Sequence, residues 1–79
     1  MKMQELFVSP KNWTQNRPYN FERTAFCLIG AVYQCYDCFC EELKLRIKRH
    51  LKVRDLAEWN DAPERIFEDI RQLVIELDI

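Results

Sequence analysis

The chain has 79 residues, of which 48% are hydrophobic and 13% aromatic, and its formal net charge is -1. A chain of this length supports one domain with a modest core, which excludes a large catalytic cavity, and its hydrophobic content is too high for a disordered protein. The near-neutral charge excludes a nucleic-acid binder that is basic throughout and an acidic mimic of DNA. Any function that depends on charge must therefore be confined to a local patch.

The longest apolar run covers residues 25–33, which is less than half of the roughly 20 residues that span a bilayer. The N-terminal residues lack the apolar stretch and the small-residue cleavage site of a secretory signal. We therefore expect a cytoplasmic protein without a membrane segment. Its four cysteines are then expected to be reduced thiols.

Residues 1–20 are predicted to be mostly ordered loop. After a short apolar segment at residues 6–8 they are rich in proline and asparagine, which break helices and form turns. Trp13 is expected to fold back onto the core as an anchor, because a large aromatic side chain is costly to leave in solvent.

Residues 21–36 are predicted to form the first long helix. Apolar side chains recur there at intervals of three and four, and Asn20 is a candidate N-cap. Gly30, the only glycine of the chain, costs about 1 kcal/mol relative to alanine inside a helix. We expect a second helix to cross at Gly30, because a close approach would explain a residue without a side chain.

Two further helices are predicted over residues 38–51 and 53–59. The first of them carries one apolar stripe and is either a separate helix after a break near Asp37 or a bent continuation of the preceding one. The pattern leaves both alternatives open. Val53, Leu56 and Trp59 indicate the shorter helix.

The last helix is predicted over residues 62–77, and it has the clearest start signals. Asp61 is the expected N-cap, Pro63 falls in the first turn, and Glu64 follows three residues after the cap. Together the elements predict an all-α fold, with one domain over residues 1–79. We expect a small bundle of three to four helices with an irregular N-terminal segment.

Three segments of the sequence resemble a known family. They are Trp13-Thr14, Cys27-Leu28-Ile29-Gly30-Ala31, and Trp59-Asn60-Asp61-Ala62-Pro63-Glu64-Arg65. In this order they resemble a family of small phage and bacterial proteins of undefined function, and W-N-D-x-P-x-R is the most specific element. The resemblance implies a phage or mobile-element context and a small helical fold, without catalytic residues. The chain departs from the family pattern at Ile66, where threonine is usual, and in its cysteines at 35–40.

The segment from Trp59 to Arg65 has two interpretations. In the structural one, Asp61 or Asn60 caps the last helix, Trp59 fills the gap between helices, and Arg65 pairs with a nearby carboxylate. In the functional one, the helix N-terminus and Arg65 together recognise an anionic group. We favour the structural interpretation, because helix-start chemistry accounts for each residue type.

Cys35, Cys38, Cys40 and His50 are the residues that a zinc site would use. Structural zinc sites usually place ligand pairs on separate turns, whereas three of these residues crowd one predicted helix without sharing a face. We favour cysteines that pack as small hydrophobic residues, with zinc as a weak alternative and no cofactor expected. His50 has nothing arranged to orient it as a catalytic base, so we expect no enzyme.

Half of the twelve basic residues lie between positions 44 and 54. On a helical wheel Lys44, Lys48, Arg49 and Lys52 form a continuous basic face beside the apolar stripe. Such faces are most often only solvated, and here they would balance the acids of the last helix. Docking onto an acidic protein surface is a second interpretation. Contact with RNA or phosphate is a third, although no aromatic residues interleave to stack bases.

The sequence therefore favours a non-enzymatic protein-binding accessory factor, encoded by a phage, located in the host cytoplasm, and acting as an inhibitor of a host or defence complex. Tyr33, Tyr36 and Phe39 form an aromatic segment larger than a small core needs, so they join the basic face as candidate contacts. The same apolar surplus also fits a homodimer seam. The alternative function is a nucleic-acid-binding module that uses the basic face of residues 44–54.

Overall fold

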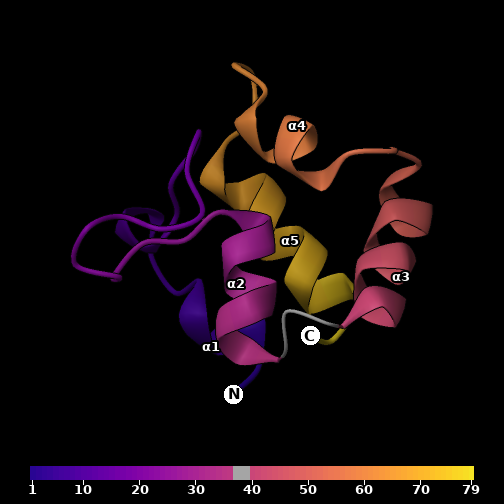
Figure 1. Cartoon of the computed structure of the whole chain (residues 1–79), viewed down its shortest axis with the longest axis horizontal. Coiled ribbons are helices and arrows are strands. Elements are labelled where there is room, and N and C mark those ends of the chain that lie inside the picture. The colour runs from indigo at the N-terminus through magenta and orange to yellow at the C-terminus, as the bar shows by residue number, and fades with distance from the viewer. Residues whose placement is uncertain (37–39) are drawn as a thin grey trace.

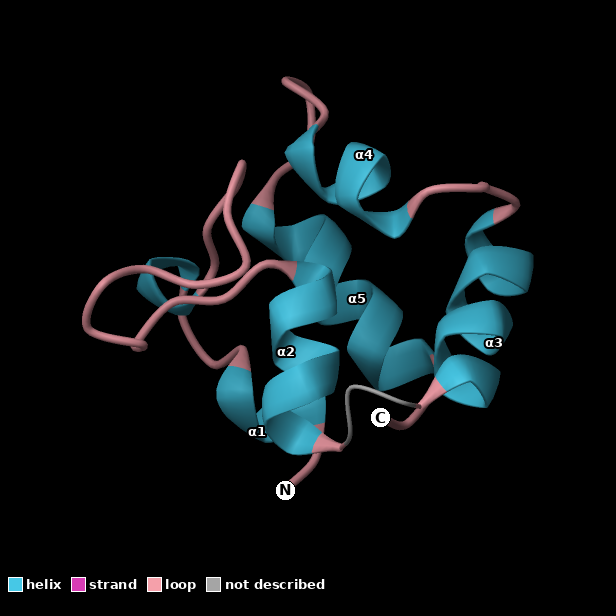
Figure 2. Ribbon diagram, in the orientation of Figure 1, coloured by secondary structure: helices cyan, strands magenta, loops and turns pink. Residues whose placement is uncertain are grey.

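The computed structural model describes residues 1–36 and 40–79. Within these ranges the elements are α1 (Met3–Leu6), the 3-10 turn η1 (Pro10–Asn12), α2 (Leu28–Cys35), α3 (Glu41–Leu51), α4 (Leu56–Asp61) and α5 (Phe67–Glu76), with no strand among them (Figure 1). Helix α5 lies between α2 and α3 in this view, and α4 lies above them (Figure 2). The predicted all-α fold is confirmed. No helix of the described ranges has the length and apolar character that a membrane span requires.

The core lies between the helices, and each of the five helices of the described ranges contributes buried side chains to it. Its buried side chains are Met3 and Phe7 at the N-terminus, Phe26, Leu28, Ala31 and Val32 around α2, Leu43 and Ile47 of α3, Leu56 of α4, and Ile70, Leu73, Val74, Leu77 and Ile79 around α5. Each large apolar side chain buried in this way contributes roughly 1.5–3 kcal/mol. Trp13 packs against this cluster from the N-terminal segment, as expected.

The N-terminal segment is mostly loop, but it also contains two short helical turns that the pattern of prolines and asparagines concealed. In α1 the backbone N–H of Lys2 donates to the Glu5 carboxylate at 2.7 Å. In η1 the first helical position is Pro10, and the Ser9 hydroxyl accepts from the N–H of Lys11. Proline needs no N–H at that position, which is why a helical turn can begin there.

The predicted helix 21–36 is wrong in its first half, because α2 begins only at Leu28. Asn20 does not cap a helix. Its side-chain oxygen instead accepts from the N–H groups of Thr24 and Ala25 at 2.8 and 3.0 Å, which closes a turn. An asparagine side chain can satisfy the backbone locally in this way and so compete with a helix. Phe26 then forms isolated bridges with Trp13 and Tyr19.

The close approach at Gly30 exists, but its partner is a loop and not a crossing helix. A Cβ on Gly30 would lie only 1.9 Å from the carbonyl oxygen of Pro18. The same oxygen accepts from the N–H of Cys27 at 2.9 Å. The glycine therefore lets the residue-18 backbone lie against the first turn of α2.

Helices α2 and α3 are two separate elements. The residues on either side of residues 37–39, which lie outside the described ranges, both leave helical geometry: Tyr36 has φ -125° and ψ -103°, and Cys40 has φ -79° and ψ 66°. Of the predicted helix 38–51, the described part forms α3 from Glu41 onward. It ends at Leu51, and the next residue, Lys52, caps it in the left-handed conformation with φ 58°.

Both remaining helices start later than predicted. The short one covers Leu56–Asp61 and not 53–59, because the Asp55 carboxylate caps it by accepting from the N–H of Glu58 at 3.1 Å. The last one begins at Phe67, so Asp61 is not its N-cap and Pro63 lies in the connecting loop. Asp69, in the first turn of α5, instead accepts from the N–H of Ile66 at 3.1 Å.

Candidate functional site

The side chain of Asn60 is the centre of a buried polar network. It is 0% exposed. Its Oδ1 accepts from the Trp13 indole N–H at 2.7 Å and from the backbone N–H of Leu28, the first residue of α2, at 3.0 Å. Its Nδ2 donates to the Thr14 carbonyl and to the Asp61 carboxylate at 3.1 and 3.0 Å. One amide thus ties α4 to the N-terminal segment and to the start of α2.

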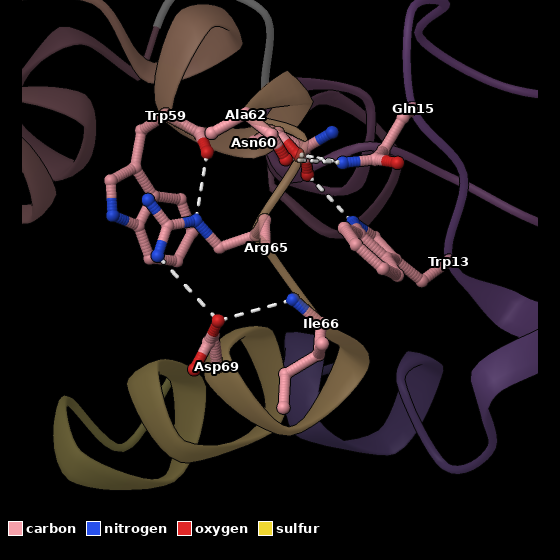
Figure 3. Close-up of polar contacts among 8 residues, drawn as sticks. All are labelled: Trp13, Gln15, Trp59, Asn60, Ala62, Arg65, Ile66 and Asp69. Carbon is pink, nitrogen blue, oxygen red and sulfur yellow. Dashed lines mark hydrogen bonds and ion pairs between the residues drawn. The ribbon is translucent and has the colours of Figure 1, made fainter.

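Two more residues of the N-terminal segment bind the end of α4. The Gln15 amide donates to the carbonyls of Asn60 and Ala62 at 2.9 and 3.0 Å, and Figure 3 shows it beside the Trp13 indole. The backbone N–H of Asn16 donates to Asp61 at 2.7 Å. The bond from Asn16 holds the Asp61 carboxylate toward the N-terminal segment, which explains why it does not cap α5. Sequence reasoning missed Gln15 and Asn16, whose only signal was their place directly after Trp13-Thr14.

Arg65 is held by groups of its own chain. Its guanidinium carbon lies 4.1 Å from the centre of the Trp59 ring. Its Nε donates to the Trp59 carbonyl at 2.9 Å, and one terminal nitrogen lies 3.5 Å from the Asp69 carboxylate (Figure 3). The predicted pairing of Arg65 with a carboxylate is confirmed. The Asp69 carboxylate therefore already neutralises the charge of Arg65 at the N-terminus of α5, and Arg65 has a structural role there.

The thiol of Cys27 belongs to the same structural region. It accepts from the N–H of Gly30 at 3.3 Å and so caps α2. Burial raises the pKa of this thiol, which keeps it protonated and poorly nucleophilic at neutral pH. Cys27 therefore packs as a small hydrophobic residue with a capping function.

All three signature segments of the sequence thus meet at one place. Hydrogen bonds bring three segments together around the Asn60 amide: Trp13-Thr14, Cys27 to Gly30, and Trp59 to Arg65. The residues of this site form hydrogen bonds, cap helices and make close contacts within the chain. The fold and the site therefore define a small all-α protein whose most specific sequence features have structural roles.

The chain belongs to a family of unknown function, DUF6197, whose model matches residues 2–76. No curated protein and no solved structure matches the chain. The family thus covers nearly the whole domain, including all three signature segments.

The candidate zinc ligands are not gathered at one place in the described part of the chain. His50 lies 2.9 Å from the Glu76 carboxylate, and Cys35 and Cys40 are free thiols. Cys38 lies outside the described residues. Within residues 1–36 and 40–79 no group of three or more His, Cys, Asp or Glu side chains is arranged to hold a metal ion.

The candidate aromatic contacts lie on the surface at the end of α2. Tyr33 and Tyr36 are 44% and 42% exposed, and Phe39 lies outside the described residues. The Lys44 ammonium of α3 lies 5.2 Å from the centre of the Tyr33 ring and 2.9 Å from the Glu41 carboxylate. We refer to Tyr33, Tyr36 and Lys44 as the aromatic-basic surface, which spans α2 and α3.

The predicted basic face of α3 is only partly available, because Lys44 is paired with Glu41. Outside that face, Arg46 donates to the Leu77 carbonyl at 2.9 Å and His50 contacts Glu76. Three further cations, Lys48, Arg49 and Lys52, form no ion pair within the described ranges. The face is therefore reduced to a cluster of three cations near the end of α3.

Proposed function

We propose that this protein is a non-enzymatic binding factor that recognises another protein through the aromatic-basic surface. The observation that carries the proposal is the exposure of Tyr33, beside Lys44, and of Tyr36 at the end of α2. Tyrosine is enriched in protein interfaces because it supplies a large, rigid contact with a polar end at low entropic cost. Within the described residues, neither ring belongs to the buried core or packs against it, so we expect neither to be needed for folding.

The cations beside this surface favour a partner with an acidic contact area. Lys44 is itself paired with Glu41, but Lys48, one helical turn further along α3, forms no ion pair within the described residues. Complementary charge raises the rate of association and selects among partners more than it raises affinity. We further propose that the protein is phage-encoded and inhibits a host or defence complex in the host cytoplasm, which rests on the W-N-D-x-P-x-R resemblance.

The test is affinity purification from the natural host with mass spectrometry of the co-eluting proteins. The wild type is compared with a Tyr33→Ser/Tyr36→Ser double variant, and Val8→Ser is the matched control because Val8 is 65% exposed and lies outside the surface. We expect a partner that is retained by the wild type and by Val8→Ser and lost by the double variant. A partner retained by all three proteins would reject this surface, and unfolding of the double variant is checked by its melting curve.

A nucleic-acid-binding module is the second candidate, favoured by the cluster of Lys48, Arg49 and Lys52, which form no ion pair with the described part of the chain. It predicts retention on RNA or DNA that falls steeply as salt rises, because bound phosphates release counterions. Charge reversal of Lys48 and Arg49 should abolish the retention. Absence of any retention at low salt would reject this candidate without affecting the first.

A further inference from the structure

The turn of residues 19–24, here called the Phe21 turn, is held rigidly by its own residues. Asn20 donates from Nδ2 to Glu22 and to the Thr24 hydroxyl at 3.1 and 2.9 Å, in addition to accepting from the backbone N–H groups of Thr24 and Ala25. The N–H of Arg23, at φ 57°, donates to the Asn20 carbonyl at 3.1 Å. A turn fixed in this way loses little conformational entropy when it binds.

The tip of the turn carries an apolar knob with cations beside it. Phe21 is 96% exposed, the largest value among the exposed large hydrophobic residues of the described ranges. The Arg23 guanidinium stacks 4.4 Å from the centre of the Tyr19 ring, and Arg17 is also exposed. The loop that precedes α2 projects at the left of Figure 1, on the opposite side of the view from α3. The aromatic-basic surface and the Phe21 turn are therefore different surfaces.

A groove beside α4, here called the Trp59 groove, is lined by apolar and acidic residues, which complement the Phe21 ring and the cations beside it. It has a volume of about 720 Å³ and is lined by Val53, Arg54, Asp55, Glu58, Trp59, Asp61, Ala62, Pro63, Glu64 and Arg65. The lining includes four acidic and two basic residues, but the carboxylates of Asp55 and Asp61 accept hydrogen bonds within the chain and Arg65 is held by Asp69. Glu58 and Glu64 form no ion pair within the described residues.

We propose that the Phe21 turn of one copy of this protein docks into the Trp59 groove of a second copy. The Phe21 ring would lie against the apolar part of the groove, at Trp59, Ala62 and Pro63. Arg23 would then lie near the carboxylates of Glu58 and Glu64. Knob and groove are different patches of one surface, so the contact is head-to-tail and adds copies until a ring closes. This self-association is independent of the proposed function.

The test measures molar mass by sedimentation of the full chain up to about 1 mM, because a contact of this size is expected to be weak. The wild type should show a mass that rises with concentration. Phe21→Ser and Glu64→Lys should each raise the dissociation constant at least about tenfold, whereas Val8→Ser, at another exposed apolar residue, should leave it within about twofold. Both variants alter exposed side chains, and unchanged melting temperatures establish that they fold.

A mixture of the two weakened variants gives the decisive result. The Phe21→Ser chain retains a groove and the Glu64→Lys chain retains a knob, so together they should form a 1:1 dimer that grows no further. A wild type of monomeric mass at every concentration would overturn the proposal, and so would association that Phe21→Ser does not weaken. Either result would leave partner capture through Tyr33 and Tyr36 unaffected.

Discussion

Asn60 illustrates how a single buried amide can organise a small protein. Removing an amide from water is costly unless its donors and acceptor find partners. Here Oδ1 accepts two hydrogen bonds and Nδ2 donates two. Two of the partners, Trp13 and Leu28, lie 47 and 32 residues away in sequence. The residue type is explained because an aliphatic side chain would leave these donors unsatisfied.

We predict that Asn60→Ala lowers the free energy of unfolding by at least about 2 kcal/mol, because it leaves the Leu28 N–H buried without a partner and opens a cavity. Equilibrium unfolding in urea measures the change. Gln34→Ala, an exposed amide on α2, is the control and should change stability by less than about 0.5 kcal/mol. A loss below about 1 kcal/mol for Asn60→Ala would show that water replaces the network.

At the scale of elements, α2 shows why helix propensity alone misplaces a boundary. The apolar spacing of residues 21–36 matches a helix, but the Asn20 side chain and the bridges of Phe26 hold the first half in a turn. Gly30 is then explained by the carbonyl of Pro18 and not by helix chemistry. Contacts between loop and helix have overridden the local pattern.

We predict that Gly30→Ala destabilises the protein by about 1–3 kcal/mol, because the added Cβ collides with the Pro18 backbone. Helix propensity predicts the opposite sign, a gain of about 1 kcal/mol. The melting temperature therefore distinguishes the two effects. An increase would mean that the Pro18 segment moves aside at little cost.

The start of α5 provides a second prediction at this scale. Asp69→Ala removes the acceptor for the Ile66 N–H and the partner of Arg65, so we expect a loss of about 0.5–2 kcal/mol. Hydrogen exchange of the first-turn amides of α5 should accelerate. Glu68→Ala is the matched control, because Glu68 also lies in the first turn but does not bind the Ile66 N–H. Equal acceleration in both variants would argue for a general charge effect at the helix start.

At the scale of the whole molecule, the two ends of the described chain are tied together. The N–H of Gln4 donates to the Ile79 carbonyl at 3.2 Å, and the Lys2 ammonium lies 2.7 Å from the Asp78 carboxylate. Arg71 of α5 donates to the carbonyls of Gln4 and Phe7. Helix α1 is thereby held against α5, although it is only one turn long.

This tie should make stability depend on pH. The hydrogen bond from Lys2 lowers the pKa of Asp78, and the hydrogen bond to Asp78 raises the pKa of Lys2. The carboxylate therefore contributes stability above its unfolded pKa, about 3.9, which is lost as the pH falls through its lower folded value. The ammonium contributes below its unfolded pKa, and this is lost as the pH rises through its higher folded value.

We predict that the free energy of unfolding of Asp78→Asn depends less steeply on pH than that of the wild type below about pH 4. The effect should be small and should shrink with added salt, because both side chains face solvent. A residual dependence should persist, since Gln72 and His50 lower the pKa of Glu76 independently. Urea unfolding at several pH values measures it, with Glu22→Gln as an exposed control. Identical pH profiles for wild type and Asp78→Asn would contradict the prediction.

Periodic apolar residues at positions 41–51 and 67–76 determined the all-α class and the helices α3 and α5. The spacing that places apolar side chains on one face of a helix is a local property of the sequence. The tertiary structure decided where α2 and α5 begin. Asp61 is held by Asn16, which lies 45 residues away, and Gly30 is fitted to Pro18. It also decided that Phe21 is exposed. The contacts of Asp61 and Gly30 join distant segments, so no local pattern in the sequence records them.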